Sequence, residues 1–222
     1  MHVAIDGPSG AGKSTVARRL ARELGCVYMD TGAMYRAVGL LAHRLGVDDR
    51  DDEALGRMLD AGVEIRAALA PEGQRTLLNG EDVEDQIRTQ EIGMAASNVA
   101  ACPSVRRALV TMQRQAAQGC DVVMDGRDIG TVVLPQAGVK IFLTAAPEAR
   151  ARRRTLELHQ RGQDADFDEI LREIRRRDEQ DENRPVAPLR QAEDAVLLDT
   201  TNLDLKGSLE ALLTLVRERL AL

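Results

Sequence analysis

A glycine-rich stretch near the start of the chain has the residue types needed to hold phosphate groups. The sequence "GPSGAGKST" at 7–15 fits the pattern G-x-x-x-x-G-K-[ST]. Glycines permit positive φ and close approach, so successive backbone N–H groups can point at an anion. In this pattern the lysine, here Lys13, reaches the β- and γ-phosphates of a nucleotide, and the next hydroxyl, that of Ser14, faces Mg²⁺. The predicted phosphate-binding residues are Gly7, Pro8, Ser9, Gly10, Ala11, Gly12, Lys13, Ser14 and Thr15.

Charged residues outside this loop indicate that a second anionic substrate binds. Arginines recur in distant segments, and their guanidinium groups suit phosphate and carboxylate recognition; they are Arg36, Arg106, Arg127, Arg177 and Arg184. Asp125 ends the apolar run "VVMD", where an enzyme with such a loop places a carboxylate that orients Mg²⁺ or its water ligands. In "RARRR" at 150–154, Arg150 shares a helical face with Arg153 and Arg154, so these three are candidate catalytic cations. A solvated helix face is the alternative interpretation of this run.

The elements that position these residues alternate between strand-like and helix-like patterns, which favours a parallel sheet covered by helices. Strands are expected at 2–6, 121–125, 139–143 and 195–199, with a short one near 26–29. Helices are expected at 13–24, 32–45, 51–61, 86–100, 103–118, 147–160, 167–180 and 206–220. The glycine-rich loop thus lies between a strand and a helix, as phosphate binding requires.

Two segments interrupt this alternation. Residues 63–84 contain turn signals at "PEG" and "NGED" and predict a small β-rich insertion. Residues 160–166, "QRGQDAD", form a polar bridge between two arginine-rich helices and are expected to be the tip of a lid.

Composition narrows the function classes. The net charge of −6 argues against a nonspecific nucleic-acid binder, which needs a broad basic surface. Three widely spaced cysteines favour free thiols in a reducing compartment. We see neither a basic leader followed by an apolar run nor an apolar stretch of about 18 residues, so we expect a cytoplasmic protein without a membrane span.

The absence of other motifs narrows the choice among nucleotide-binding classes. The base-reading pattern N-K-x-D of GTPases does not occur, and a motor or transporter ATPase would normally be larger or carry coupling segments. A kinase with a small anionic acceptor remains, with a P-loop ATPase or a nucleotide-binding regulatory module as the rival class.

Six motifs occur in an order that resembles bacterial-type cytidylate kinases: "DGPSGAGKST", "DTGAMYR", "IRTQEIGMAAS", "DGRDIGTVV", "KIFLTA" and "RRRDEQDENRPVAPL". The resemblance runs over nearly the whole chain. It implies an α/β P-loop kinase fold with a five-stranded parallel sheet flanked by helices. It further implies a single domain over 1–222, with an NMP-binding region at about 30–100 that includes the insertion 63–84 and with a helical lid at about 150–170.

The activity that this resemblance implies is Mg²⁺-dependent transfer of the γ-phosphoryl group of ATP to CMP or dCMP by a monomer. The implied CMP-binding residues are Thr31, Tyr35, Arg36, Ser97, Arg106, Arg127, Asp128, Arg177, Asp181 and Arg184. Thr31 stands where enterobacterial-type members have Ser, and it keeps the hydroxyl. Ser14 stands where some relatives have Gly, and it supplies the usual hydroxyl at the metal position.

The chemistry of these side chains fits the implied roles. The Asp128 carboxylate suits the N4 amino donor of cytosine and would leave a uracil carbonyl unpaired. No catalytic base is needed, because the attacking phosphate oxygen is already ionised near neutral pH. Plainer interpretations remain open: Ser97 as an ordinary helix serine, Asp125 and Asp128 as turn caps. UMP, AMP and shikimate are the alternative acceptors.

Overall fold

The main sheet has five strands in the order β2-β6-β1-β7-β8. They are β1 (His2–Asp6), β2 (Val27–Asp30), β6 (Val122–Gly126), β7 (Val139–Thr144) and β8 (Val196–Asp199). In this computed structural model, which describes residues 1–70, 73–160 and 162–220, β1 pairs in parallel with β6 and β7, and β7 with β8. Asp6 is in register with Gly126, so the segments that follow β1 and β6 begin side by side.

The chain divides into two compact units. The first contains Met1–Tyr28 and Cys120–Leu222, and the second contains Met29–Gly119. Each unit has its own hydrophobic core, with Ile5, Leu20 and Leu212 among the buried residues of the first and Leu55, Ile87 and Leu109 among those of the second.

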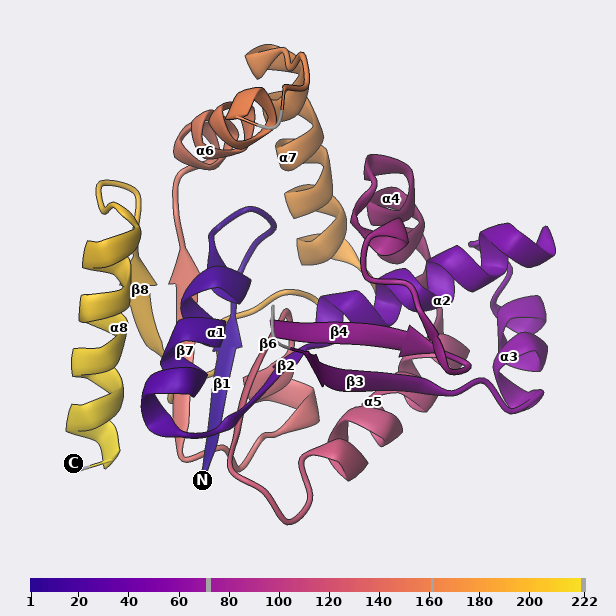
Figure 1. Cartoon of the computed structure of the whole chain (residues 1–222), viewed down its shortest axis with the longest axis horizontal. Helices are drawn as coiled ribbons and strands as arrows, with labels where there is room; N and C mark the ends of the chain where they lie inside the picture. The colour runs from indigo at the N-terminus through magenta and orange to yellow at the C-terminus, as the bar shows by residue number, and fades with distance from the viewer. Residues whose placement is uncertain (71–72, 161, 221–222) are drawn as a thin grey trace. The chain divides into compact units, whose positions relative to one another are not determined.

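In the first unit, helices α1 (Lys13–Leu24) and α8 (Leu205–Leu220) lie beside the main sheet (Figure 1), and their apolar residues share a core with those of the strands. Helices α6 (Pro147–Gln160) and α7 (Phe167–Asn183) follow β7 and pack against each other. A short π-helix, η2 (Ile129–Val133), follows β6. This helix was not predicted from the sequence.

The second unit combines helices with a small antiparallel sheet in the order β3-β4-β5. The strands are β3 (Ile65–Ala70), β4 (Gly73–Leu78) and β5 (Glu81–Asp82), which confirms the predicted β-rich insertion. The helices are α2 (Thr31–Leu45), α3 (Asp52–Asp60), the 3₁₀ turn η1 (Gln86–Arg88), α4 (Gln90–Val99) and α5 (Pro103–Ala116). The turn expected at "PEG" includes Pro71 and Glu72, which lie outside the described residues, as does Arg161 in the bridge 160–166.

One predicted helix, 86–100, is wrong as a continuous element. Thr89 is extended, with φ −72° and ψ 159°, and separates η1 from α4. Its hydroxyl accepts a hydrogen bond from the backbone N–H of Ile92 at 3.3 Å and so caps α4. The remaining helices agree with prediction to within a few residues. None of the helices that the structure describes is long and apolar enough to cross a membrane.

Candidate active site

The loop after β1 has the backbone shape of a phosphate cradle. Gly7, Gly10 and Gly12 all have positive φ, and a Cβ on Gly7 would lie 1.9 Å from the carbonyl oxygen of Leu143 on β7. Only glycine fits at that position. Gly12 is the N-cap of α1 and has no side chain that could accept a hydrogen bond from the first turn of this helix. The positive end of its dipole is thus available to an anion.

Lys13 is buried within this loop, and its ammonium group donates a hydrogen bond to the carbonyl oxygen of Pro8 at 2.8 Å. Burial and the positive charge of Arg127 lower the pKa of Lys13 from 10.5 to about 7, although Asp125 opposes the shift. Bound phosphates would compensate the ammonium charge at this position, so the site favours an anionic ligand.

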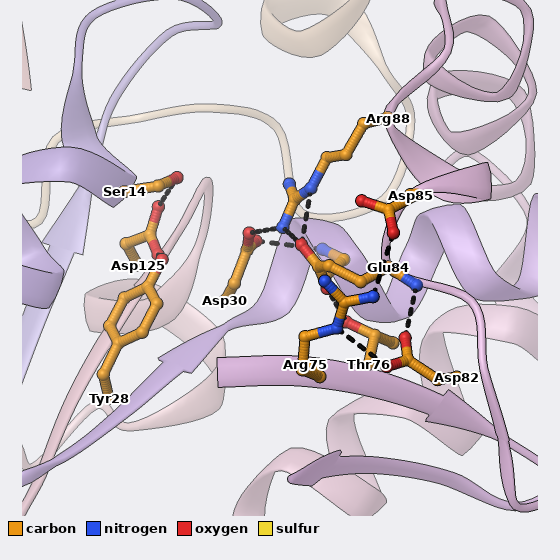
Figure 2. Close-up of polar contacts among 11 residues, drawn as sticks. Ser14, Tyr28, Asp30, Arg75, Thr76, Asp82, Glu84, Asp85, Arg88 and Asp125 are labelled. Carbon is orange, nitrogen blue, oxygen red and sulfur yellow. Dashed lines mark hydrogen bonds and ion pairs between the residues drawn. The ribbon is translucent and has the colours of Figure 1, made fainter. Parts of the chain in front are cut away.

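The two residues predicted to hold Mg²⁺ are in contact. The hydroxyl of Ser14 donates a hydrogen bond to Asp125 Oδ2 at 2.9 Å (Figure 2). The other carboxylate oxygen accepts a hydrogen bond from the hydroxyl of Tyr28 at 2.8 Å. Mg²⁺ prefers oxygen ligands and is usually held by one or two carboxylates together with substrate phosphates, so this pair fits the ion. Tyr28, which orients the carboxylate, was not predicted, because nothing local to it in the sequence indicates its partner.

A second unpredicted residue, Asp6, fixes the segment that follows β6. Its two carboxylate oxygens accept hydrogen bonds from the backbone N–H groups of Ile129 and Gly130, both at 2.7 Å. Burial raises the pKa of Asp6 to about 6, although these two hydrogen bonds oppose the shift. The start of η2, and with it the adjacent Asp128, is thereby tied to the strand that leads into the phosphate loop.

Five of the predicted CMP-binding residues belong to the first unit and form one polar network. Arg127 donates a hydrogen bond to Asp181 at 2.7 Å, and Arg184 lies 3.5 Å from Asp128. Burial raises the pKa of Asp181, but the charge and hydrogen bond of Arg127, together with the charges of Arg184 and Arg177, outweigh burial and hold the pKa below its ordinary value. Burial and Arg127 together lower the pKa of Arg177. A bound anion would offset the cost of keeping these arginines charged in a buried position.

The other five belong to the second unit, on α2 (Thr31, Tyr35, Arg36), α4 (Ser97) and α5 (Arg106). Arg106 is buried, and its guanidinium carbon lies 5.9 Å from the centre of the Tyr35 ring. Asp30, the N-cap of α2, accepts a hydrogen bond from the backbone N–H of Ala33 at 2.9 Å. Burial raises the pKa of Asp30, but the charges of Arg88 and Arg36 outweigh this and lower it.

The three arginines predicted as catalytic on α6 all have protein partners. Arg150 is buried and forms a bidentate ion pair with Asp178, at 2.9 and 2.6 Å. It also donates a hydrogen bond to the carbonyl oxygen of Ser9 in the phosphate loop at 2.8 Å. Arg153 donates hydrogen bonds to the carbonyl oxygens of Thr200 and Leu203, and Arg154 pairs with Glu157 at 3.0 Å. In this arrangement Arg150 supports the phosphate loop directly, whereas action on the transferred phosphoryl group stays a prediction for all three.

Comparison with known proteins agrees with this arrangement. The family model for cytidylate kinase matches residues 3–218. The chain is 51% identical over 217 residues to the cytidylate kinase of Syntrophotalea carbinolica, covering 98% of this chain and 92% of that protein. It is 48% identical to the cytidylate kinase of Shouchella clausii, covering 98% and 96% of the two chains.

A shikimate kinase structure from Bacteroides thetaiotaomicron has the same fold, with a TM-score of 0.51 at 16% identity over 100% of this chain and 99% of that one. The phosphate loop, the arginine network and the match over almost the entire length lead to one assignment: the chain belongs to the cytidylate kinase family.

Proposed function

We propose that this chain transfers the γ-phosphoryl group of ATP to CMP or dCMP in a Mg²⁺-dependent reaction that yields ADP and CDP or dCDP. The observation that carries the proposal is that Arg127, which is held by Asp181 at 2.7 Å, places a second positive charge near Lys13 of the phosphate loop. The phosphate loop accounts for one nucleotide, and the arginine supplies a positive charge that a second phosphate can use. A kinase needs both, because donor and acceptor phosphates must approach each other.

On the donor side, residues 7–15 bind the ATP phosphates and Lys13 neutralises negative charge that develops during transfer. Ser14 and Asp125 hold Mg²⁺, directly or through bound water, and Tyr28 keeps the carboxylate oriented. When bound, the ion neutralises charge on the β- and γ-phosphates. Arg150 fixes the loop through Ser9.

On the acceptor side, Arg36, Arg127 and Arg184 bind the CMP phosphate. Asp128 accepts the hydrogen bond from the cytosine amino group, with Ser97 and Arg106 nearby. Tyr35 and Thr31 contact the nucleotide, and Arg177 and Asp181 reach the nucleoside, where Asp181 accepts from a ribose hydroxyl. The phosphate oxygen of CMP attacks as an ion, so these residues align it rather than deprotonate it.

The regions of the chain receive corresponding roles. Residues 30–100 are proposed as the NMP-binding region, and 150–170 as a lid that excludes water when it closes, because water would otherwise accept the phosphoryl group. We expect a monomer in the cytoplasm that uses small-molecule substrates rather than nucleic acid.

A coupled assay of ADP release with Mg–ATP and a panel of acceptors tests the proposal. The panel contains CMP, dCMP, UMP, AMP, shikimate and a blank without acceptor. We expect strong turnover with CMP and dCMP, weak turnover with UMP and almost none in the blank, because a buried polar mismatch at Asp128 costs orders of magnitude in rate. Turnover with another acceptor would overturn the assignment of Asp128, and ADP release in the blank at the full rate would make the protein an ATPase.

A further inference from the structure

A chain of polar contacts in the second unit connects the small sheet to the first turn of α2 (Figure 2). Thr76 on β4 donates a hydrogen bond to Glu84 Oε2 at 2.8 Å. Arg88 donates from Nε to Glu84 Oε1 at 2.8 Å and from Nη2 to Asp30 Oδ2 at 3.0 Å. We call Asp30, Thr76, Glu84 and Arg88 the Arg88 cluster.

The partners of Arg88 in this cluster are largely buried, which distinguishes the cluster from an ordinary surface ion pair. Asp30 and Thr76 are 4% and 3% exposed, and the side chain of Glu84 is 13% exposed. Exposed ion pairs are loosely held, whereas buried charges with several hydrogen bonds have fixed orientations. The single guanidinium group of Arg88 therefore holds two carboxylates in defined positions.

The two carboxylate oxygens of Asp30 accept hydrogen bonds from different groups. Oδ1 accepts from the N–H of Ala33 and caps α2, while Oδ2 accepts from Arg88. After burial, the charges of Arg88 and then Arg36 are the largest influences on the Asp30 carboxylate, so both arginines lie near it. Without Arg88, Arg36 would be the main positive charge near Asp30 Oδ2. The attraction between the two would draw Arg36 toward Asp30.

We propose that Arg88 is a positioning residue: it holds Asp30 so that the first turns of α2 present Arg36 to the phosphate of the acceptor nucleotide, and Glu84 and Thr76 transmit this constraint from the β-rich insertion. This inference rests on the proposed function, in which Arg36 binds that phosphate. The insertion 63–84 would thereby contribute to binding of the acceptor nucleotide.

The same insertion contains a matched control. Arg75 on β4 pairs with Asp82 at 2.7 Å and with Asp85 at 2.9 Å. Its side chain is 29% exposed, close to the 32% of Arg88. Within the described part of the chain, these ion pairs of Arg75 stay in or next to the insertion and do not reach Asp30. Arg75→Met therefore removes an arginine with two ion pairs without disturbing the cap of α2.

The test compares Arg88→Met with Arg75→Met in steady-state assays, with the melting temperature of each variant measured in parallel. For Arg88→Met we expect the KM for CMP to rise about tenfold and the KM for ATP to change less than about twofold, because only the acceptor side loses a positioned arginine. For Arg75→Met we expect both KM values to stay within about twofold of wild type.

Two milder variants keep the test decisive if Arg88→Met does not fold. Arg88→Lys retains the charge but cannot hold both carboxylates with a planar fork, so it should raise the KM for CMP by less than Arg88→Met. Thr76→Val removes only the hydroxyl that orients Glu84, so we expect a still smaller rise in the KM for CMP.

If Arg88 had a purely structural role, Arg88→Met would lower the melting temperature and the active fraction but leave the KM for CMP unchanged. That result, or an equal rise for CMP and ATP, would overturn the inference. Failure of the proposed function is distinguishable, because wild-type protein would then show no turnover with CMP in the acceptor panel.

Discussion

At the scale of single residues, Asp6 has the property with the clearest thermodynamic consequence. It is a buried carboxylate with a pKa raised to about 6, and the positions of two backbone N–H groups of η2 depend on it. A carboxylate whose folded pKa lies above its unfolded value of 3.8 binds more protons in the folded state. The stabilisation that this preferential proton binding gives the folded state is complete below pH 3.8 and is lost as the pH rises through about 6.

We therefore predict that Asp6→Asn changes the pH dependence of stability. Between about pH 5 and about pH 7, wild type should lose about 1 kcal/mol of unfolding free energy relative to the variant, because Asn does not titrate. Urea unfolding of both proteins at both pH values measures this difference. The substitution also alters the hydrogen bond to Gly130, but that cost is the same at both pH values and cancels when the changes in unfolding free energy are compared. Parallel pH curves for the two proteins would contradict the raised pKa.

At the scale of elements, α5 contains an unusual position. Gln113 is 1% exposed, and neither its Oε1 nor its Nε2 has a hydrogen-bond partner within the part of the chain that the structure describes. A buried amide of this kind costs about 1–3 kcal/mol relative to an apolar group of the same shape.

Replacement of this amide should stabilise the protein. We predict that Gln113→Met, which nearly conserves volume, raises the free energy of unfolding by about 1–2 kcal/mol. Gln115→Met on the exposed face of the same helix is the control and should change it by less than about 0.5 kcal/mol. Chemical denaturation of both variants gives the comparison. If Gln113→Met is less stable than wild type, the amide must be satisfied in solution, for example by a buried water molecule.

The elements also show what could be predicted from sequence. The strands of the main sheet and most helices were predicted because periodicity and local stop signals such as Gly25 specify them. The π-helix η2 was missed, since "IGTVV" is rich in β-branched residues and its conformation depends on the distant Asp6. The break at Thr89 was missed because a capping threonine inside an apolar helical pattern does not show whether the helix starts there or continues.

The candidate site divides in the same way. Lys13, Ser14 and Asp125 were predicted from a motif and from the end of a strand, both of which are local. Tyr28 and the cluster around Arg88 were not predicted, because their partners lie 97 and 58 residues away in the chain. Contacts of that kind are specified by the packed fold rather than by any window of sequence.

At the scale of the whole molecule, the chain contains two units with separate cores, and it passes between them only at residues 28–29 and 119–120. All residues proposed to bind ATP phosphates, 7–15, belong to the first unit. Ligands that bind only folded protein suppress the opening of the region to which they bind.

We predict that a non-hydrolysable ATP analogue with Mg²⁺ protects the two units unequally from hydrogen exchange. At about 100 times its Kd, the analogue should slow exchange about 100-fold for core amides of β1 and β6, which open with the first unit. Core amides of α5 should be slowed much less. Mass spectrometry of deuterium uptake measures both regions in one sample. Equal slowing in the two units would show that they open as one cooperative body.

The contact between Gly7 and β7 bears on the rate of nucleotide binding. Because the glycine lies against the carbonyl oxygen of Leu143, the strand holds this part of the loop in its cradle shape before any nucleotide arrives. Association then requires an encounter but no folding of the loop, so different triphosphates should bind at similar rates. Discrimination among them would reside in residence time, that is, in how quickly each one dissociates.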